Sequence, residues 1–401
     1  MPKEKMLVPK LRFSEFEEEL KNIELKKAAT INPKSKELPD SFIYIDLESV
    51  ENGILAKEER IYKNEAPSRA QRLLSKGDIL YQTVRPYQMN NYFFYKNNID
   101  YVASTGYAQI RTKNNSKYLY QYLHTFYFVN KVLLRCTGTS YPAINSTDLS
   151  KIKVNIPSLK EQQKIANFLT SIDTQIQTLE KKKTLLEQYK KGVIQKIFKQ
   201  ELRFKDEDGN AFPEWEKRKF SEVLFEHKLK STGKEEVHSV SVHKGVINQI
   251  EHLGRSFSAK DTSHYSRVLP NDIIYTKSPT GDFPLGIIKQ NHIKEDVIIS
   301  PLYGVFTPET KELGYILHVY FESPINTSNY LSSIIQKGAK NTINITNTKF
   351  LSKKMLLPVS KEEQIKIANF LSAIDENIDL VNTKIEQTKS YKKGLLQQMF
   401  V

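Results

Sequence analysis

Cysteine is almost absent from this sequence, since Cys136 is the only one among 401 residues. A disulfide within the chain is therefore excluded, and a metal site built on cysteine is disfavoured. We interpret Cys136 as a small buried residue rather than a nucleophile. Because structural disulfides belong to oxidising compartments, this composition favours a reducing cytoplasm as the place where the chain works.

Long apolar stretches are also lacking. No run approaches the ~18 consecutive apolar residues that a membrane-spanning helix needs. The opening MPKEKMLVPKLRF has charge but no apolar segment of signal-peptide length. We therefore expect neither a membrane span nor a cleaved signal peptide.

Common motifs for enzyme chemistry are missing as well. There is no phosphate-binding GxxxxGK[ST], no GxGxxG after a strand and no HExxH. The chain has no Pro-Pro dipeptide, which removes the Asp/Asn-Pro-Pro-aromatic motif of amino-group methyltransferases. Asp78 and Asp272 could belong to a nuclease cluster, but each follows Gly or Asn at the start of a predicted strand, which is typical of turn residues. The sequence therefore predicts a recognition protein that has no catalytic site of its own.

Positive charge and apolar mass are abundant instead. Lys and Arg number 60 against 46 Asp and Glu, which gives a formal net charge of +14. Hydrophobic residues make up 39% of the chain, enough for folded cores. The excess of positive charge favours a polyanionic partner such as DNA or RNA. The alternative is a basic soluble protein with no nucleic-acid role.

An internal repeat is the strongest feature of the sequence. The six residues KIANFL stand at Lys164–Leu169 and again at Lys366–Leu371, 202 positions later. The same offset pairs Glu161-Gln162 with Glu363-Gln364, Asp173 with Asp375, and Tyr189–Gly192 with Tyr391–Gly394. More faintly, the letters LRF open both halves, at Leu11–Phe13 and Leu202–Phe204. The chain is therefore a duplication in which a variable half and a near-constant tail occur twice.

Each near-constant tail predicts one long helix. Apolar residues recur at steps of four and three from Ile165 in the first tail and from Ile367 in the second. Pro157 and Pro358 precede the tails, and no proline lies inside them. We expect two helices of about 38 residues that pack on each other as an intramolecular antiparallel coiled coil. The alternative is two separate amphipathic helices, each lying on its own domain.

The variable halves predict mixed α/β domains. Strand-like runs such as SFIYIDL, DILYQTV and NYFFYK in the first half have counterparts such as DIIYTK and DVIISPLYGVF in the second. Helix-like runs lie between them, for example KYLYQYLHTFYFVNKVLLR. The expected fold class is α+β, with tandem mixed domains, two long helices and a pseudo-twofold internal repeat.

Polar loops that follow the helix-like runs are the first candidate DNA contacts. They are CTGTSYPAIN at Cys136–Asn145 and GAKNTINIT at Gly338–Thr346. Small polar and basic residues suit contacts to phosphates and base edges. From these loops we select as DNA-binding candidates Thr139, Ser140, Tyr141, Lys340, Asn341 and Thr342. The alternative is an ordinary helix C-cap followed by a turn.

Segments after the GDILY and NDIIY strands supply further candidates. Arg can make bidentate contacts to guanine, and Gln and Asn to adenine. The candidates are Arg85, Tyr87, Gln88, Asn90 and Asn91 in the first half and Lys277, Ser278 and Thr280 in the second. Each could instead belong to a solvated hairpin loop. We predict no catalytic residue and no metal ligand.

Taken together, these features resemble the specificity (S) subunits of type I restriction–modification systems over essentially the whole chain. The resemblance rests on the tails PSLKEQQKIANFLTSIDTQI and PVSKEEQIKIANFLSAIDENI, on TGTSYPAIN, on FPEWEKRKF, and on GDILY with NDIIY. It implies target recognition domains at residues 1–157 and 201–358, a central conserved helical region at 158–200 and a C-terminal one at 359–401. The second polar loop lacks the Tyr-Pro of TGTSYP and departs from the pattern there.

The resemblance also implies a function. Each recognition domain of such a subunit reads one half of a bipartite double-stranded DNA target, and the little identity between these two halves fits an asymmetric one. Two modification subunits bind S-adenosylmethionine and methylate adenine N6, while restriction subunits use ATP and Mg for translocation and cleavage. This chain would be non-catalytic and would hold no cofactor itself. The helical regions, with Gln162, Lys164 and Asn167 on their exposed face, would dock the modification subunits.

Two other interpretations stay open. One is a self-contained DNA methyltransferase or nuclease with divergent motifs, which S-adenosylmethionine binding or DNA cleavage by the chain alone would favour. The other is a structural coiled-coil protein whose charge is incidental, for which unrelated DNA would compete as well as any defined site.

Overall fold

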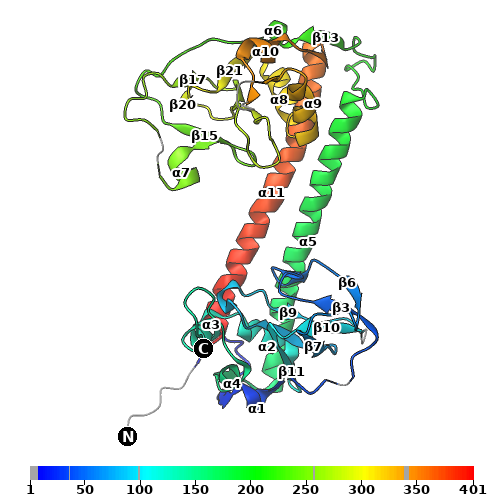
Figure 1. Cartoon of the computed structure of the whole chain (residues 1–401), viewed down its shortest axis with the longest axis vertical. Helices are drawn as coiled ribbons and strands as arrows, with labels where there is room; N and C mark the ends of the chain where they lie inside the picture. Colours follow the sequence, from blue (N-terminus) through cyan, green and yellow to red (C-terminus); the bar gives the residue numbers. More distant parts are fainter. Residues whose placement is uncertain (1–7, 36, 98–99, 256–257, 338–342) are drawn as a thin grey trace. The chain divides into compact units, whose positions relative to one another are not determined.

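The chain folds into two compact units. A computed structural model describes residues 8–35, 37–97, 100–255, 258–337 and 343–401. Unit 1 contains Met1–Lys182 and Val381–Val401, and unit 2 contains Lys183–Leu380. Both units include segments of the long helices α5 (Leu159–Phe198) and α11 (Lys361–Met399), which Figure 1 draws in green and in orange to red. Each unit therefore combines one variable half with the beginning of one helix and the end of the other.

Unit 1 is a mixed α/β domain. Its strands are β1 (Lys21–Glu24), β2 (Ala29–Ile31), β3 (Ser41–Ile45), β4 (Val50–Glu51), β5 (Ile54–Leu55), β6 (Glu59–Tyr62), β7 (Ala70–Leu73), β8 (Ile79–Gln82), β9 (Tyr92–Phe93), β10 (Tyr101–Ser104), β11 (Tyr107–Thr112) and β12 (Lys153–Ile156). Its shorter helices are α1 (Leu25–Ala28), η1 (Pro86–Gln88), α2 (Ser116–Leu123), α3 (Phe126–Leu133) and α4 (Ser146–Ser150). The larger sheets have the orders β6-β3-β10-β7 and β2-β11-β8-β9.

Unit 2 is also a mixed α/β domain, with one four-stranded sheet among its described residues. Its strands are β13 (Glu216–Lys219), β14 (Leu224–Phe225), β15 (His238–Ser241), β16 (Gly245–Asn248), β17 (Ser266–Val268), β18 (Ile273–Tyr275), β19 (Ile288–Gln290), β20 (Val297–Ile299), β21 (Gly304–Pro308), β22 (Gln336–Lys337), β23 (Ile343–Asn344) and β24 (Lys354–Leu357). Its shorter helices are α6 (Phe220–Val223), α7 (Gln249–Leu253), α8 (Lys311–Tyr320), α9 (Pro324–Ser332) and α10 (Asn347–Ser352).

The repeat that is faint in the variable halves is plain in their topology. The sheet β2-β11-β8-β9 of unit 1 corresponds to β14-β21-β18-β19 of unit 2, strand for strand. The antiparallel pair β1-β12 likewise corresponds to β13-β24. The GDILY and NDIIY stretches form β8 and β18 in equivalent places. The predicted pseudo-twofold repeat of mixed α/β halves is confirmed.

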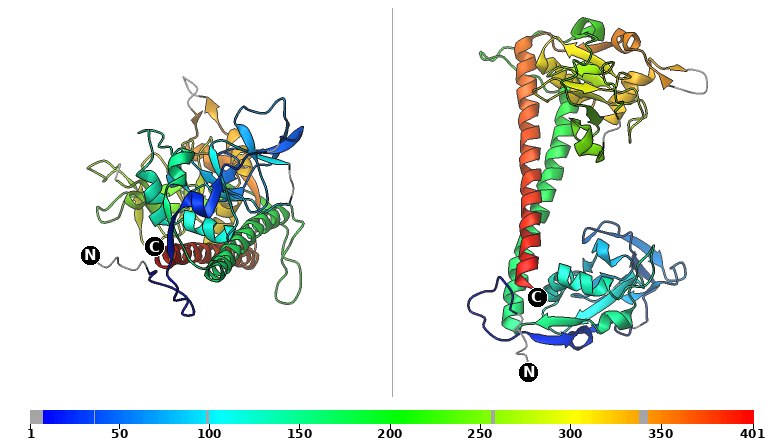
Figure 2. Two further views of the ribbon diagram at one scale, coloured as in Figure 1. Left: turned by 90° about the horizontal axis from the view of Figure 1, so that it is seen from below. Right: turned by 90° about the vertical axis from the view of Figure 1, so that its left-hand side faces the viewer.

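The long helices form as the sequence predicts, with lengths of 40 and 39 residues. In unit 1, Ile165 and Leu169 of α5 share an apolar core with Leu395 and Met399 of α11. Within this unit the start of α5 thus packs on the end of α11 (Figure 2), so this part of the helix pair is antiparallel. Within the described residues, no helix is both long enough and apolar enough to cross a bilayer.

Unit 2 contains the matching half of the helix pair. There Val193 and Ile197 near the end of α5 share a core with Ile367 and Leu371 near the start of α11. The predicted antiparallel coiled coil is therefore present in each unit. Its seam is apolar because the steps of four and three keep one face of each helix against its partner.

Two lysines of this seam, Lys190 and Lys392, are each paired with an aspartate of the opposite helix. Lys392 Nζ lies 2.5 Å from Asp173 Oδ1 in unit 1, and Lys190 Nζ lies 2.7 Å from Asp375 Oδ1 in unit 2. The repeat relates the two contacts to each other, because both aspartates and both lysines stand 202 positions apart. A buried charge without a partner is costly, so the two pairs favour one register of the helices over its neighbours.

The environment of Lys190 shows how such a charge is tolerated. Lys190 is 9% exposed, and its ammonium also lies 2.6 Å from Oε2 of Glu322, which follows α8 in the chain. Burial acts to lower the pKa of Lys190, but Glu322 and Asp375 together outweigh burial and raise it. Lys190 therefore stays charged and ties both long helices to the second variable half.

The LRF and KIANFL repeats meet in space. In unit 1 the Arg12 guanidinium donates to both carboxylate oxygens of Glu161 at 2.8 Å, and Phe13 packs edge-on against Phe168 with ring centroids 5.9 Å apart. The Glu161 residue is only 1% exposed. The segment that leads into the first half is thus fastened to the beginning of the helix that follows it.

Unit 2 repeats this arrangement with one addition. Arg203 Nε donates to Glu363 Oε1 at 3.3 Å, and Phe204 packs against Phe370 with centroids 5.5 Å apart. Trp215 Nε1 donates to the other carboxylate oxygen of Glu363 at 3.1 Å. Burial raises the pKa of Glu363, while the contacts from Trp215 and Arg203 act in the opposite direction.

The glutamine next to each of these glutamates corrects one prediction. Gln162 and Gln364 are 3% and 1% exposed, and their side-chain amides donate to Pro157 O and Pro358 O at 2.9 Å. The expectation that Gln162 lies on the exposed face of its helix is therefore wrong. Its carboxamide donates to a backbone carbonyl just before the helix instead of facing solvent. Lys164 and Asn167 are exposed as expected.

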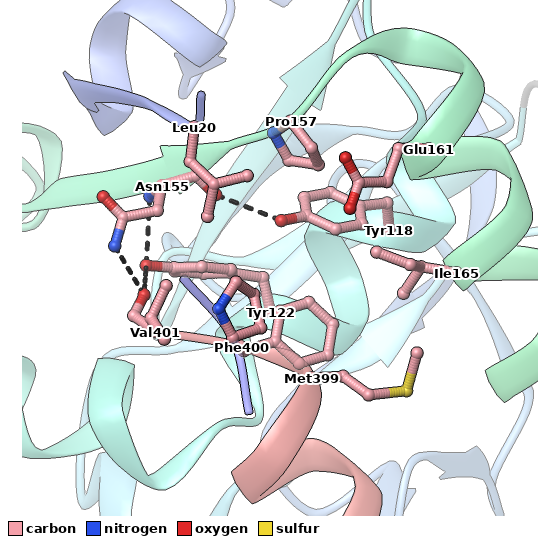
Figure 3. Close-up of a pocket in the computed structure, with 11 residues that line it drawn as sticks. Leu20, Tyr118, Tyr122, Asn155, Pro157, Glu161, Ile165, Met399, Phe400 and Val401 are labelled. Carbon is pink, nitrogen blue, oxygen red and sulfur yellow. Dashed lines mark hydrogen bonds between the residues drawn. The ribbon is translucent and has the colours of Figure 1, made fainter. Parts of the chain in front are cut away.

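The end of α11 is anchored on the first variable half (Figure 3). Phe400 packs on Tyr118 and Tyr122 with ring centroids 5.5 and 5.7 Å apart. The Tyr122 hydroxyl and the Asn155 side-chain amide both donate to Val401 O, at 3.2 and 2.6 Å. The cavity between these residues measures about 10 Å³, which leaves room for one water at most. We assign no ligand to it.

Candidate nucleic-acid interface

The two candidate segments of the first half form one surface. The Arg85 backbone N–H donates to Pro142 O at 2.7 Å, and Val84 bridges Ala143 in antiparallel fashion. The polar loop closes on itself through two backbone hydrogen bonds of 2.9 Å between Thr137 and Ala143. The loop therefore presents the exposed residues Thr139, Ser140 and Tyr141 beside the segment that follows β8.

Gly138 is required at the start of this loop. Its φ is 88°, in the left-handed region that side chains with a Cβ disfavour. A Cβ there would also lie 3.1 Å from Tyr141 O, which is tighter than ordinary contact. The glycine therefore allows the loop to turn back so tightly that Tyr141 projects from it.

Arg85, in the segment after β8, contacts Tyr141 of the polar loop. The guanidinium carbon of Arg85 lies 4.3 Å from the centroid of the Tyr141 ring. Tyr141 is 62% exposed, and no carboxylate pairs with Arg85 among the residues that the structure describes. The pair thus offers unsatisfied N–H donors and an aromatic face to an external partner.

The backbone around η1 is held in an uncommon conformation. Arg85 and Met89, which flank this single turn, both have φ of 53°, a left-handed value that costs a non-glycine residue about 1 kcal/mol. Buried Gln82 supports the turn, since its Nε2 donates to Gln88 Oε1 at 2.8 Å and its Oε1 accepts from the Asn90 backbone at 3.1 Å. Tyr87 is 48% exposed on the same turn.

Two asparagines after η1 serve the fold. Asn91 is 1% exposed, and its Oδ1 accepts from the Gln82 backbone N–H at 2.8 Å, so its prediction as a DNA contact is wrong. Asn90 is half-buried, and its Oδ1 accepts from the Asn52 backbone N–H at 3.0 Å. A polar residue near a recognition loop can be there to satisfy the backbone, and the sequence does not distinguish the two uses.

The contact with Asn52 reveals a third segment at this surface. The turn between β4 and β5 contains Asn52 and Gly53, with φ of 51° and 78°, and the following Ile54 is 47% exposed. Asn-Gly between short strands is the strongest local signal for a tight hairpin. The signal in ENGI was available in the sequence, but nothing in it indicates that this hairpin lies beside Asn90.

The candidates of the second half that the structure describes lie in one loop after β18. Thr280 and Phe283 exchange two backbone hydrogen bonds of 3.0 Å that close a turn at Gly281 and Asp282; Thr280 is half-buried, and Ser278, before the turn, is exposed. Lys277 has φ of 56°, and burial lowers the pKa of its ammonium, an effect that Glu226 partly offsets. The remaining candidates, Lys340, Asn341 and Thr342, lie outside the described residues.

The aspartates that a nuclease would need are used by the fold. Asp78 is completely buried, where its carboxylate accepts from the Ser75 backbone N–H at 2.7 Å and pairs with Arg111 at 2.7 Å. Asp272 is also completely buried and accepts from the Leu269 backbone N–H at 2.7 Å. Both are thus turn residues, as predicted. The described part of the chain contains no group of three or more His, Cys, Asp or Glu side chains suited to a metal ion.

Comparison with known proteins places this duplicated architecture in a family. The model of the family described as "Type I restriction modification DNA specificity domain" matches residues 18–188 and 253–390, well over half of the chain. The chain belongs to this family. The two matches fall on the two variable halves with the adjoining helices, so each repeat carries one specificity domain.

Curated relatives of this specificity-domain chain are similar over part of their length. The MjaVIII specificity subunit of a type I restriction enzyme from Methanocaldococcus jannaschii is 25% identical over 284 residues, which is 65% of this chain and 64% of the relative. The HindI specificity subunit from Haemophilus influenzae is 31% identical over 141 residues, 33% of this chain and 29% of the relative. The alignments with curated relatives thus span less than two thirds of their length.

Solved structures show the same fold for specificity-domain chains over nearly the full length. The S subunit of a type I restriction–modification system from M. genitalium matches with a TM-score of 0.60 at 14% identity, covering 98% of this chain and 99% of that one. A chain from a study of complex assembly in the type I restriction–modification system matches with a TM-score of 0.54 at 17% identity, covering 95% and 96%. At such identities the likeness concerns the fold.

Proposed function

We propose that this chain is the non-catalytic specificity subunit of a type I restriction–modification complex. In this role it binds a bipartite double-stranded DNA target and directs adenine-N6 methylation and restriction by partner subunits. The observation that carries the proposal is the duplication: two specificity domains share one topology, and each is joined to both helices of an antiparallel pair. In such a chain, each specificity domain binds one half of the DNA target, and the helix pair connects the two domains.

Differences between the candidate surfaces support an asymmetric target. The first half presents a hairpin loop with Arg85 stacked on Tyr141, whereas the loop of the second half contains Lys277 and Ser278. Two readers with the same scaffold and different side chains bind different base sequences, because specificity comes from contacts to base edges. The two half-sites are therefore expected to differ.

Exposed identities between the repeats support two copies of one partner. Residues that are identical in the two repeats and buried along the seam are explained by packing. Tyr189 and Tyr391 are also identical, but they are 53% and 57% exposed, so packing does not explain them. Other identical pairs that are exposed in both copies are Asn167 with Asn369, Lys182 with Lys384, Lys191 with Lys393 and Gln195 with Gln397. Equal surfaces bind equal partners, so we propose that one modification subunit docks on each helical repeat.

The chemistry of the complex belongs to other chains in this proposal. The modification subunits would bind S-adenosylmethionine, and restriction subunits would use ATP and Mg. Within the described residues, the carboxylates Asp78 and Asp272 are both held by backbone and side-chain partners, which argues against the alternative of a self-contained nuclease.

Purified subunits provide the test. We expect the chain alone to neither bind S-adenosylmethionine nor cleave DNA, whereas the chain mixed with its modification subunit should methylate adenine in one defined sequence. Methylation or cleavage by the chain alone would instead favour the self-contained enzyme. DNA binding by the mixture that unrelated DNA competes away as well as any defined site would favour a structural protein with incidental charge.

A further inference from the structure

We infer that Arg85, held in place by Tyr141, reads a guanine in the half-site bound by the first variable half. This inference rests on the proposed function and adds to it the identity of one base and of the side chain that contacts it.

The arginine is held in position before any partner arrives. Its backbone is pinned to the polar loop by the 2.7 Å hydrogen bond to Pro142 O and is fixed in the left-handed region at φ 53°. The guanidinium carbon lies over the Tyr141 ring, 4.3 Å from its centroid. A side chain confined in this way loses less conformational freedom on binding than a flexible lysine, so more of its hydrogen-bond energy appears as affinity.

The unpaired N–H donors of the Arg85 guanidinium indicate which base the side chain can contact. The Tyr141 ring contacts the guanidinium without accepting a conventional hydrogen bond, and no described residue accepts one from the Arg85 side chain, so its N–H donors are available to a partner. Arg12, Arg111 and Arg203 have their donors satisfied by carboxylates, but no described carboxylate pairs with Arg85. Two parallel donors match the O6 and N7 acceptors of guanine in the major groove, which is the commonest base-specific contact that arginine makes.

The described part of the second half does not repeat this arrangement. Its left-handed residue after the equivalent strand is Lys277, whose ammonium is a point charge without a planar fork, and burial lowers its pKa. A lysine in this environment does not offer the bidentate geometry of arginine. The guanine contact is therefore assigned to the first half-site.

Base analogues test the inference in the complete complex. The probes are duplexes that contain the target defined by methylation mapping, with 7-deazaguanine replacing one guanine of the half-site at a time, which removes N7 and keeps base pairing. For the wild-type chain with its modification subunits, we expect one position at which the analogue weakens binding by about tenfold or more. The Arg85→Gln complex should bind the natural duplex more weakly than the wild type by a similar factor. Because this variant no longer contacts the guanine, its affinities for the natural duplex and for the duplex with the analogue at that position should differ by less than about twofold.

Matched variants separate base reading from charge. Arg135→Gln removes the same charge from an exposed arginine near the loop, and it should weaken target and unrelated DNA to the same extent. Tyr141→Phe keeps the aromatic face and should bind as the wild type does, whereas Tyr141→Leu should lose part of the preference for guanine. Thermal melting of each variant, with no change expected, checks that the fold is intact.

Three results would overturn the inference. In the first, the affinity losses caused by Arg85→Gln and by 7-deazaguanine are independent, so that the combined loss is their product. In the second, Arg85→Gln weakens binding to unrelated DNA as much as binding to the target. In the third, the half-site contains no guanine. In each of these cases the wild-type complex still prefers a split target, so the proposed function survives. A wild-type complex without preference for any sequence would remove the proposed function and this inference together.

Discussion

Arg203 contacts two glutamates whose surroundings differ completely. The Glu363 side chain is 1% exposed and also accepts from the Trp215 indole, whereas the Glu214 side chain is 89% exposed. We predict that Glu363→Ala lowers the free energy of unfolding by about 2–3 kcal/mol, because it leaves buried donors without an acceptor. Glu214→Ala should change it by less than ~0.5 kcal/mol. Urea unfolding of both variants measures the difference, and equal values would contradict the assignment of Glu363 as the fastening residue.

Lys190 provides a second comparison with an adjacent control. Lys190 is buried against Asp375 and Glu322, while Lys191 is exposed on the outer face of the same helix. We predict that Lys190→Met destabilises the chain by about 1–3 kcal/mol, since Asp375 loses its lysine partner and Glu322 keeps only the more distant lysine, Lys289, while both carboxylates keep some access to water. Lys191→Met should have an effect within ~0.5 kcal/mol in the same thermal or urea unfolding experiment. The account of the seam fails if the two variants are equally stable.

At this scale the sequence predicts the turn aspartates but not the fate of every polar residue. Asp78 and Asp272 follow turn residues at strand starts, and that local pattern suffices. Gln162 and Asn91 look like surface residues, yet each is buried because its side chain satisfies a backbone group of a segment whose position depends on the tertiary fold. Such roles depend on distant neighbours, so a one-dimensional pattern cannot show them.

Among the elements, the long helices are the most predictable. Their period persists over many turns, so a few polar interruptions such as Lys190 do not obscure it. Short elements are harder: the helix-like run beginning at Lys117 is broken into α2 and α3, because Thr125 caps α3 by accepting from the Phe128 N–H at 3.2 Å. The order of strands within the sheets depends on non-local pairing and has no local signal.

The exposed tyrosines of the helical repeats make the docking proposal testable. We predict that Tyr189→Ala or Tyr391→Ala alone reduces the complex from two modification subunits to one, and that the double variant binds none. Truncating an exposed aromatic anchor in an interface typically removes 2 kcal/mol or more, about thirtyfold in affinity. Native mass spectrometry counts the subunits, and Leu185→Ala, also exposed on α5 but without an identical residue in the other repeat, is the control. Unchanged stoichiometry in the double variant would contradict this docking surface.

The helix pair also predicts how the spacer is set. Deleting residues 176–182 of α5 together with residues 384–390 of α11 removes one heptad from each helix while keeping the Asp173–Lys392 and Lys190–Asp375 pairs. The helices shorten by about 10 Å, which corresponds to about three base pairs of DNA. We expect the permitted spacer to change or binding to be abolished in a selection from duplexes with varied spacers. Deleting the heptad from one helix only should disrupt the seam and unfold the chain.

An unchanged result has a clear meaning in that experiment. If the double deletion folds and binds the original target with the original affinity, the helix pair does not act as a ruler. The side-chain reading of each half-site would then remain, and only the role of the helices would need another explanation.

For the whole molecule, duplication explains why fold and function are easier to predict than the contact residues. The near-constant tails keep their packing residues, so the repeat is visible in sequence, and one four-stranded sheet and one strand pair of each half then have the same order. The recognition loops diverge because each faces its own half-site, and divergence removes the signal that the repeat supplies elsewhere. The first surface can be traced from Arg85 to Tyr141, whereas part of the second lies outside the described residues.

The most direct measurement is a map of adenine methylation in the host genome with and without this chain, while the modification subunit is present and active. We expect deletion of the chain to abolish methylation of one motif that is split by unspecified bases and whose two halves differ. That result would define both half-sites and the spacer together. Methylation that is unchanged by the deletion, or the loss of a motif without a spacer, would contradict the specificity role.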